Sequence, residues 1–226
     1  MLLVKFKKVD SFAFCSYLNC RDAIIQTIKR ANIQVEYSQG FNPHELLYFS
    51  PPTSLGIESE CEYFTIYTND IFDFAGRFNA NAPSGLQVIW TKEMNTRPDF
   101  YNLIDYAKFE IQTDSKKNEI NLCNMDYDVF DEKKQSSINI HDLIRNIKFC
   151  NGKFDCVIAC GQKSNLKIMN LVKCLKNSFD VNVLNIRKVE LYKNESSDNA
   201  LKNENTNSKY EQLEIGSLVP IDILLQ

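Results

Sequence analysis

The first forty residues carry two different hydrophobic patterns. Near the N-terminus the apolar residues Leu2, Val4 and Phe6 alternate with Leu3, Lys5 and Lys7, which is the period of a half-buried strand. From Leu18 to Ala31 apolar residues recur every three or four positions instead. This spacing predicts an amphipathic helix that Ser16 can cap and that ends near Asn32.

Turn-forming residues and short β-rich runs follow this helix. Residues 39–43 contain glycine, asparagine and proline and are predicted to form a loop. Residues 46–49 and 63–67 are rich in aromatic and β-branched side chains, so they predict the two strands of a long hairpin. Asp70 is expected to cap a second helix, and a strand is expected at residues 86–90. The resulting order, β-α-β-β-α-β, is that of the ferredoxin-like split βαβ arrangement.

The second half repeats this order more faintly. Strands are predicted at residues 107–112, at 149 with 154–160 around an Asn151-Gly152 turn, and at 183–191. Helices are predicted at residues 140–147 and 169–176, and a polar loop at 127–137. The expected fold class is therefore α+β, with two tandem ferredoxin-like (βαββαβ) units and a mobile polar segment near the C-terminus.

The same patterns predict the domain bounds. Residues 1–95 and 96–193 form the two expected units. Residues 194–208 are rich in Asn, Ser, Lys and Glu and cannot repay the entropy of ordering, so they are expected to be a mobile linker. Residues 209–226 regain apolar character and are expected to dock back as an edge strand that contains Pro220.

Composition limits the kinds of partner. The hydrophobic fraction of 44% and charged fraction of 24% are those of an ordinary globular protein. A net charge of -3 gives no global positive field, so any RNA contact would have to be local. No apolar stretch approaches a membrane span, and lysines interrupt the N-terminal region where a signal peptide is apolar. We expect a cytoplasmic protein that does not bind membranes.

The eight cysteines do not form a metal motif. No Cys-x-x-Cys pair occurs, and Cys156 and Cys160 lie in an apolar, strand-like run, whereas zinc sites usually place closer pairs on turns. We expect reduced and mostly buried thiols. With only two histidines, His44 and His141, a metal site would have to join distant parts of the chain, so no metal and no cofactor are predicted, and His141 is interpreted as structural.

Three stretches carry a resemblance to a known family. Residues 37–44, Tyr-Ser-Gln-Gly-Phe-Asn-Pro-His, match a Tyr-Ser-x-Gly-Phe-Asn-Pro-His-Pro pattern, and residues 56–63 match Gly-x-x-Ser-x-Gly-Glu-Tyr with Cys61 in place of the second glycine. A Ser-His-Leu-Asp pattern is altered here, because Tyr17 and Asn19 replace its histidine and aspartate. On these residues the chain resembles the radical-SAM-linked proteins of bacteria, an uncharacterised family, with the clear match at residues 12–67.

The resemblance implies an accessory role. Members resemble domains fused to, or encoded beside, radical SAM proteins with a cobalamin-binding region, which implies a binding module that presents RNA or a protein substrate. No catalytic mechanism comes with the family. The Cys-x3-Cys-x2-Cys signature of a radical SAM cluster is absent after Cys156, where Lys163 occupies the third cysteine's place, so this chain does not carry that chemistry.

The candidate binding residues lie on the first helix and in the matched stretches. Cationic and aromatic side chains could form a rim for phosphate or base contacts around the Gly-Phe-Asn-Pro-His loop. The set is Arg21, Lys29, Arg30, Tyr37, Ser38, Gly40, Phe41, Asn42, Pro43, His44 and Glu62. No catalytic residue is assigned. Three alternatives stay open: a purely structural loop, a stand-alone RNA-binding protein, and an enzyme with Asn42, His44 and Glu62 in one pocket.

Motifs for common enzyme classes are missing. Neither GxxxxGK nor GxGxxG occurs, and GxSxG is absent as well. Nucleotide hydrolysis and α/β-hydrolase chemistry therefore have no support in the sequence.

Overall fold

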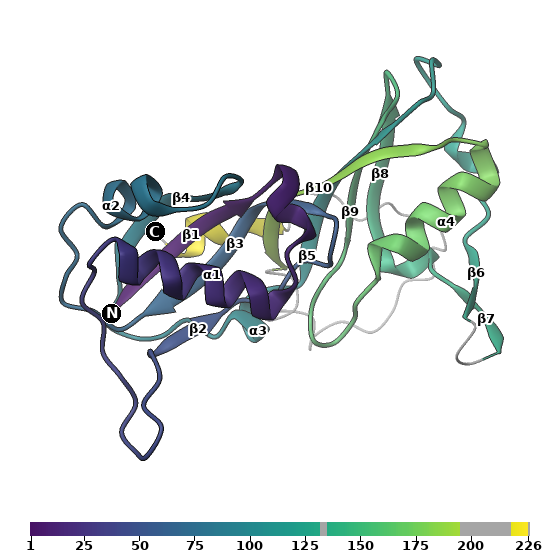
Figure 1. The fold of residues 1–226 in the computed structure, drawn as a ribbon. Helices are drawn as coiled ribbons and strands as arrows, with labels where there is room; N and C mark the ends of the chain where they lie inside the picture. The colour runs from purple at the N-terminus through teal and green to yellow at the C-terminus, as the bar shows by residue number, and fades with distance from the viewer. Residues whose placement is uncertain (132–134, 195–217, 226) are drawn as a thin grey trace. The chain divides into compact units, whose positions relative to one another are not determined.

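The computed structural model describes residues 1–131, 135–194 and 218–225. The chain divides into two compact units, Met1–Tyr101 and Asn102–Gln226, which are taken separately below (Figure 1). A short helix, α3 (Phe100–Leu103), contains the division point. The boundary expected from the sequence lay a few residues earlier, after residue 95.

Unit 1 alternates strands and helices. Its elements are β1 (Leu2–Lys8), the 3-10 helix η1 (Asp10–Phe14), α1 (Tyr17–Arg30), β2 (Leu47–Phe49), β3 (Glu58–Ile66), α2 (Phe74–Asn81) and β4 (Leu86–Glu93). The strands lie in the order β4-β1-β3-β2, and each neighbouring pair is antiparallel. The predicted strand at the N-terminus, the helix after Ser16 and the strand at residues 86–90 are confirmed.

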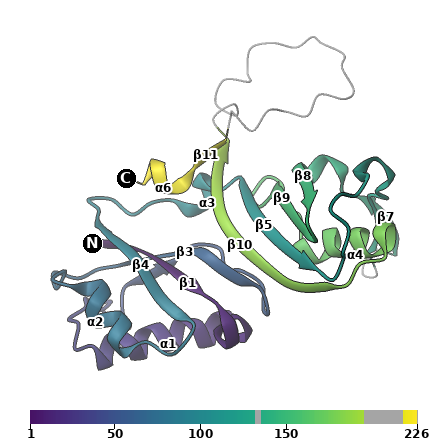
Figure 2. The same cartoon turned by 90° about the horizontal axis from the view of Figure 1, so that it is seen from above.

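The core of unit 1 lies between the sheet and its two helices. Figure 2 shows α1 and α2 on the same side of the β4-β1-β3 strands. Ile24 and Ile28 of α1 and Phe78 of α2 are almost completely buried against Val4 and Phe64 of the sheet. Burial of large apolar side chains is the main favourable term in folding, so this layer fixes where α1 lies.

The two ends of α1 are held by specific polar contacts. The Ser16 hydroxyl accepts a hydrogen bond from the Asn19 amide at 3.3 Å, so the predicted cap is confirmed. At the other end the guanidinium of Arg77 donates to the carbonyl oxygens of Ala31 and Asn32, at 3.2 and 2.7 Å. These bonds satisfy carbonyl groups at the helix end.

The predicted cap of the second helix is wrong. Helix α2 begins at Phe74, after Asp73 in a left-handed conformation, and not after Asp70. The carboxylate of Asp70 is already used elsewhere, because it accepts from Arg77 at 2.7 Å and from the Gln34 amide at 3.1 Å. The ion pair with Arg77 and the long-range bond from Gln34 have therefore displaced the capping role that the sequence indicated.

Unit 2 is built around a second antiparallel arrangement. Its elements are β5 (Tyr106–Thr113), the 3-10 helix η2 (Leu122–Asn124), β6 (Asp128–Asp131), β7 (Ser136–Asn139), the 3-10 helix η3 (His141–Leu143), β8 (Ile144–Cys150), β9 (Lys153–Ala159), α4 (Ile168–Phe179), β10 (Val183–Asn194), β11 (Leu218–Pro220) and α6 (Ile221–Leu224). The strand order is β10-β5-β9-β8, and β11 pairs with β10. The predicted strands at 107–112 and 183–191 and the helix at 169–176 are confirmed.

Two predictions for unit 2 are wrong. Residues 140–147 were expected to form a helix but contain the short η3 turn and the start of β8. The β8–β9 hairpin explains this, because its strand pairing extends from the Asn151-Gly152 turn back to Ile144 and outweighs the weak helical pattern. The expected loop at 127–137 contains β6 and β7, since Val129 is buried and pairs with Ile138.

The fold class is a mixture of α and β elements, as expected, and it contains few helices. The ferredoxin-like description of the two units stays a prediction.

Of the expected mobile linker, residues 195–208 lie outside the described residues. Of the expected C-terminal edge strand, β11 pairs with β10 and places Pro220 opposite Tyr192, and a helical turn follows. In the described ranges, no helix is long and apolar enough to cross a membrane.

Candidate functional site

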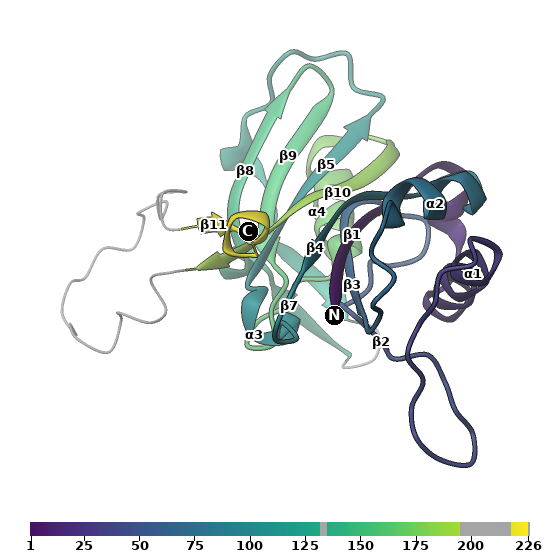
Figure 3. The same cartoon turned by 90° about the vertical axis from the view of Figure 1, so that its left-hand side faces the viewer.

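The family motif at residues 37–44 forms a loop that projects from unit 1. Figures 1 and 3 show the connection between α1 and β2 extending away from the sheet. Its neck is closed by a β-bridge between Tyr37 and Glu45. The Ser38 amide donates to the His44 carbonyl at 2.8 Å, and the Ser38 hydroxyl accepts from the His44 amide at 3.1 Å. That hydroxyl also lies 2.9 Å from Nδ1 of the His44 ring.

The tip of this loop is aromatic and exposed. Phe41 has a relative exposure of 113%, and Tyr37 at the neck is 44% exposed. Gly40 has a φ of +139°, which only glycine adopts without strain, and a Cβ placed there would meet no atom within 4 Å. A large apolar side chain held in solvent at a loop tip indicates a recognition surface more than a folding element.

The predicted cations do not gather around the loop tip. Lys29 Nζ lies 2.8 Å from Glu45 Oε1 at the base of the loop. Arg30 turns toward α2, where its guanidinium donates to the Asn81 carbonyl at 2.9 Å. Arg21 lies 3.4 Å from the carboxylate of Asp22. Of the three, only Lys29 contributes to the loop, and it does so by bracing its base.

The Lys29–Glu45 pair also shifts both ionisation equilibria. Burial acts to raise the pKa of Glu45, but the hydrogen bond from Lys29 outweighs it with help from backbone and charge contacts, so the pKa lies below its ordinary value. The same hydrogen bond raises the pKa of Lys29. Both groups are charged at neutral pH, which keeps the base of the loop closed.

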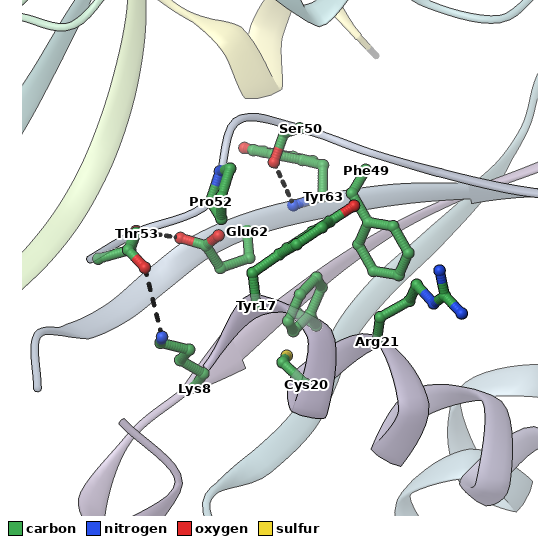
Figure 4. A pocket seen from close by; sticks show the side chains of 11 residues that line it. Lys8, Tyr17, Cys20, Arg21, Phe49, Ser50, Pro52, Thr53, Glu62 and Tyr63 are labelled. Atoms are coloured by element: carbon green, nitrogen blue, oxygen red, sulfur yellow. Dashed lines mark hydrogen bonds between the residues drawn. The ribbon is translucent and has the colours of Figure 1, made fainter. Parts of the chain in front are cut away.

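A second candidate region is a small hollow between α1, the end of β1, β2 and the middle of β3 (Figure 4). Its cavity volume is about 20 Å³, enough for roughly one water molecule, and it opens to solvent. The lining side chains combine charged, hydroxyl and aromatic groups. They are Phe6, Lys8, Tyr17, Cys20, Arg21, Phe49, Ser50, Pro52, Thr53, Glu62 and Tyr63.

A bulge in β3 places two polar residues on the same face of the sheet. Phe6 of β1 is opposite Glu62, but Lys8 is opposite Ser59, so three steps along β3 correspond to two along β1. Ser59 and Glu62 would otherwise point to opposite faces, because side chains alternate along a strand. Here the Ser59 hydroxyl donates to Glu62 Oε1 at 2.6 Å.

Glu62 is the acceptor centre of the hollow. Its side chain is buried, and Oε1 accepts from the Thr53 hydroxyl at 2.5 Å as well as from Ser59. Thr53 comes from the connection between β2 and β3, so this bond ties that connection to the sheet. Ser50 reinforces it, because its hydroxyl accepts from the Tyr63 amide at 3.1 Å.

Lys8 supplies a buried cation beside Glu62. It continues the inward-facing row that begins with Leu2, Val4 and Phe6, yet it ends in an ammonium group and is only 4% exposed. Its Nζ donates to the carbonyl oxygens of Cys15 and Thr53, each at 3.5 Å. Both contacts are at the outer limit of hydrogen-bond length.

Cys20 also lines the hollow, and its thiol is unreactive. Burial raises the pKa of the Cys20 thiol to about 12, although the nearby Lys8 charge acts to lower it. The thiol is therefore protonated at neutral pH and is a poor nucleophile. Above it, the ring of Tyr17 meets that of Phe49 edge-on at 5.9 Å.

The structure thus separates the residues that the sequence grouped together. Arg21 and Glu62 line the hollow, whereas none of residues 37–44 does. Asn42 and His44 are exposed on the loop, so they do not share a pocket with Glu62. His141 is also exposed, paired with Asp142 at 3.0 Å and edge-on to Tyr127.

Sequence reasoning missed most of the hollow, notably Lys8, Tyr17, Cys20 and Thr53. One signal was present, namely a lysine at the end of an inward-facing apolar row. Thr53 carried no signal, because its role depends on a tertiary contact with Glu62. Across the described residues no three His, Cys, Asp or Glu side chains come close enough to hold a metal ion.

Comparison with known proteins places the chain in a family but gives no activity. The profile of DUF2344, described as an uncharacterised protein conserved in bacteria, matches residues 1–168. A comparison with curated proteins gives no match. The link to radical SAM proteins stays a prediction.

Proposed function

We propose that this chain, which belongs to the DUF2344 family of uncharacterised bacterial proteins, is a protein-binding module. The family gives no activity, so the proposal is based on the arrangement of side chains in the structure. The recognition element is the projecting loop, residues 37–45, with Phe41 as its anchor. The observation that carries the proposal is the full exposure of Phe41 at the tip of a loop whose neck is closed by hydrogen bonds.

The chemistry of the tip favours a protein partner. Buried aromatic anchors contribute much of the energy of protein interfaces, and a pre-ordered loop reduces the entropy lost on binding. RNA binding needs cations near the phosphates, and residues 37–45 contain no lysine or arginine. Lys29, the nearest predicted cation, is engaged by Glu45. We therefore rank RNA as the weaker alternative.

The proposed partner is the radical SAM protein implied by the family resemblance, with this chain as a non-catalytic accessory. The ferredoxin-like arrangement expected for unit 1 is the proposed scaffold. Within it, β2 and α1 flank the loop and provide a stable base. An enzyme pocket at the loop is not part of this proposal, because Asn42 and His44 lie apart from Glu62.

Co-purification tests the proposal. The tagged chain and a radical SAM protein from the same bacterium are expressed together. Phe41→Ala is the test variant and Phe72→Ala is the control, since Phe72 is also strongly exposed in unit 1. Loss of a hot-spot side chain is expected to weaken binding about thirtyfold. Phe72→Ala should bind as the unaltered chain does.

Two results would reject the proposal. One is absence of binding by the unaltered chain under reducing, low-salt conditions. The other is equal binding by Phe41→Ala and the unaltered chain. Measuring binding to RNA at two salt concentrations separates the alternative, because an interaction dominated by phosphate contacts weakens steeply as salt increases.

A further inference from the structure

In unit 2, residues 156–179 carry positive charge only. This stretch contains no aspartate or glutamate, and the acids nearest to it in sequence are Asp155 and Asp180. Its four lysines are all exposed and are called here the lysine surface, namely Lys163, Lys167, Lys173 and Lys176. In the part of the chain that the structure describes, none of these four ammonium groups pairs with a carboxylate. A chain with a net charge of -3 therefore exposes a local group of cations.

Helix α4 places two of these lysines on one stripe. The apolar face of the helix is buried, with Leu171 and Leu175 almost completely covered. Met169, Lys173 and Lys176 are spaced by four and three residues, so they are neighbours on the opposite, exposed face. The cations therefore lie on a rigid element whose other side is fixed in the core of unit 2.

The acids nearest to α4 in space lie on a different side of the helix. Strand β6 lies beside α4 (Figure 1), and the Asp126 amide that precedes this strand donates to the Ser178 hydroxyl at 2.9 Å. Burial and the charges of Asp126 and Asp128 raise the pKa of the Cys174 thiol to about 11. Cys174 and Ser178 are one helical turn apart and face these acids, whereas Lys173 faces solvent.

The N-terminal end of α4 is an unfavourable place for the lysines that it holds. A helix carries partial positive charge at its N-terminus, which favours acidic side chains and disfavours basic ones. Lys167 nevertheless occupies the N-cap position, forms no capping hydrogen bond, and is followed by no acidic residue in the first turn. It is exposed between the buried Leu166 and Ile168. Departures from local helix preferences are expected at functional surfaces, where a bound anion would remove the conflict.

The composition of the lysine surface favours a nucleic acid over a protein or a membrane. Lysine is depleted in protein interfaces, which are enriched in aromatic residues instead. An interfacial membrane helix needs a free apolar face, and the apolar face of α4 is already buried. Lysines together with amide and hydroxyl side chains make most contacts to phosphate and sugar. Exposed groups of this kind lie between the lysines, at Gln162, Ser164, Asn165 and Asn177.

We propose that the lysine surface of unit 2 binds the phosphodiester backbone of RNA or DNA. The ammonium groups contact phosphates, and the neighbouring amides and hydroxyl contact phosphate and sugar oxygens. This surface is separate from the loop at residues 37–45 in unit 1, which contains no lysine or arginine. The inference goes beyond the proposed function, and either can fail without the other.

Binding of the full chain to labelled oligouridine and oligothymidine of equal length tests the surface by fluorescence anisotropy. Four phosphate contacts to a single strand should give a slope of about -3 for log affinity against log salt, which is roughly a fiftyfold loss between about 50 mM and about 200 mM salt. Equal affinity for the two strands identifies the shared backbone as the ligand, and tighter binding to oligouridine identifies RNA, because only RNA carries the 2′-hydroxyl. Polyglutamate and phosphatidylserine vesicles should displace the strands less well than an unlabelled strand of equal charge.

Two double substitutions locate the contacts. Lys163→Gln with Lys167→Gln removes one half of the lysine surface, and Lys173→Gln with Lys176→Gln removes the other half. Each should weaken binding and bring the slope to about -1.5. The matched control is Lys116→Gln with Lys117→Gln, which removes two exposed lysines from the loop after β5 and should keep the affinity and the slope. Circular dichroism checks the fold of each variant, and the two test variants support one another if one of them does not fold.

Four results would overturn the proposal. The first is that neither strand binds at about 50 mM salt, and the second is that the affinity does not depend on salt. The third is that both test variants bind as tightly as the control variant, or that the control loses as much affinity as they do. The fourth is that polyglutamate or the vesicles compete as well as a nucleic acid, which would show attraction to negative charge of any kind.

Discussion

The loop at residues 37–45 and the strand β3 differ in how they use the family motif. The loop turns most of its matched residues outward, and Phe41 is fully exposed at its tip. Strand β3 turns Ser59 and Glu62 inward, where they bind one another and Thr53. Two neighbouring stretches of one family resemblance therefore serve different physical purposes: the first presents exposed side chains, for which we propose a role in recognition, and the second builds a polar hollow.

The strongest test of this contrast compares two phenylalanines. Phe64 is fully buried between Phe6 and Phe49, so Phe64→Ala should lower the free energy of unfolding by about 3–5 kcal/mol. Phe41→Ala should change it by less than about 0.5 kcal/mol. Urea denaturation followed by circular dichroism measures both. A large loss of stability in Phe41→Ala would show that the loop tip is packed.

A smaller effect separates two serines of the motif. Ser59→Ala removes a buried donor from Glu62 and should cost about 1–3 kcal/mol, because the carboxylate then loses part of its solvation. Ser38→Ala acts at an exposed neck and should cost about 0.5 kcal/mol or less. The same denaturation experiment compares them. Equal losses of stability in the two variants would contradict the assignment of Ser59 to the interior and Ser38 to the surface.

The reactivity of Cys20 compared with exposed cysteines measures how closed the hollow is. The pKa of Cys20 is raised to about 12 by burial, so iodoacetamide at pH 8 should leave it largely unmodified in the folded protein. The exposed Cys123 and Cys150 should react under the same conditions. Peptide mass spectrometry measures each site. Rapid labelling of Cys20 would show that the hollow opens readily.

The smallest expected effect concerns acid and the base of the loop. The folded-state pKa of Glu45 lies below 4.5, its ordinary value, so its bond to Lys29 stabilises the fold above that pH. This contribution is lost as the pH falls through the folded value, below 4.5. Carboxyl chemical shifts of Glu45 and amide shifts of the loop should stay constant from pH 7 to 5. In Lys29→Ala the Glu45 titration should move to higher pH.

Local patterns explain how much of the fold could be predicted. Helix α1 was predictable because Ser16 caps it and its apolar spacing matches the buried face that contains Ile24 and Ile28. Asp70 was misassigned because its carboxylate pairs with the Arg77 side chain of α2 and accepts from the distant Gln34 amide instead of capping the helix. The helix predicted at residues 140–147 was wrong for a related reason, since pairing with β9 outweighs a short helical pattern.

The candidate site was harder to predict than the fold. The loop residues were found because glycine, asparagine and proline mark a turn by their own conformational limits. Lys8 and Glu62 come together only through strand pairing, and Ser59 joins them only because β3 contains a bulge. Counting by two along β3 would place Ser59 on the opposite face from Glu62, so periodicity gives the wrong answer there.

The closed neck of the loop has a consequence for the speed of recognition. The bridge between Tyr37 and Glu45 already holds the two ends of the loop together, and hydrogen bonds between Ser38 and His44 fix the neighbouring residues. A molecule that captures Phe41 therefore meets a loop whose ends need not be brought together first. Its association rate is set by diffusion and orientation, and differences in affinity among such molecules should be expressed in how fast they dissociate.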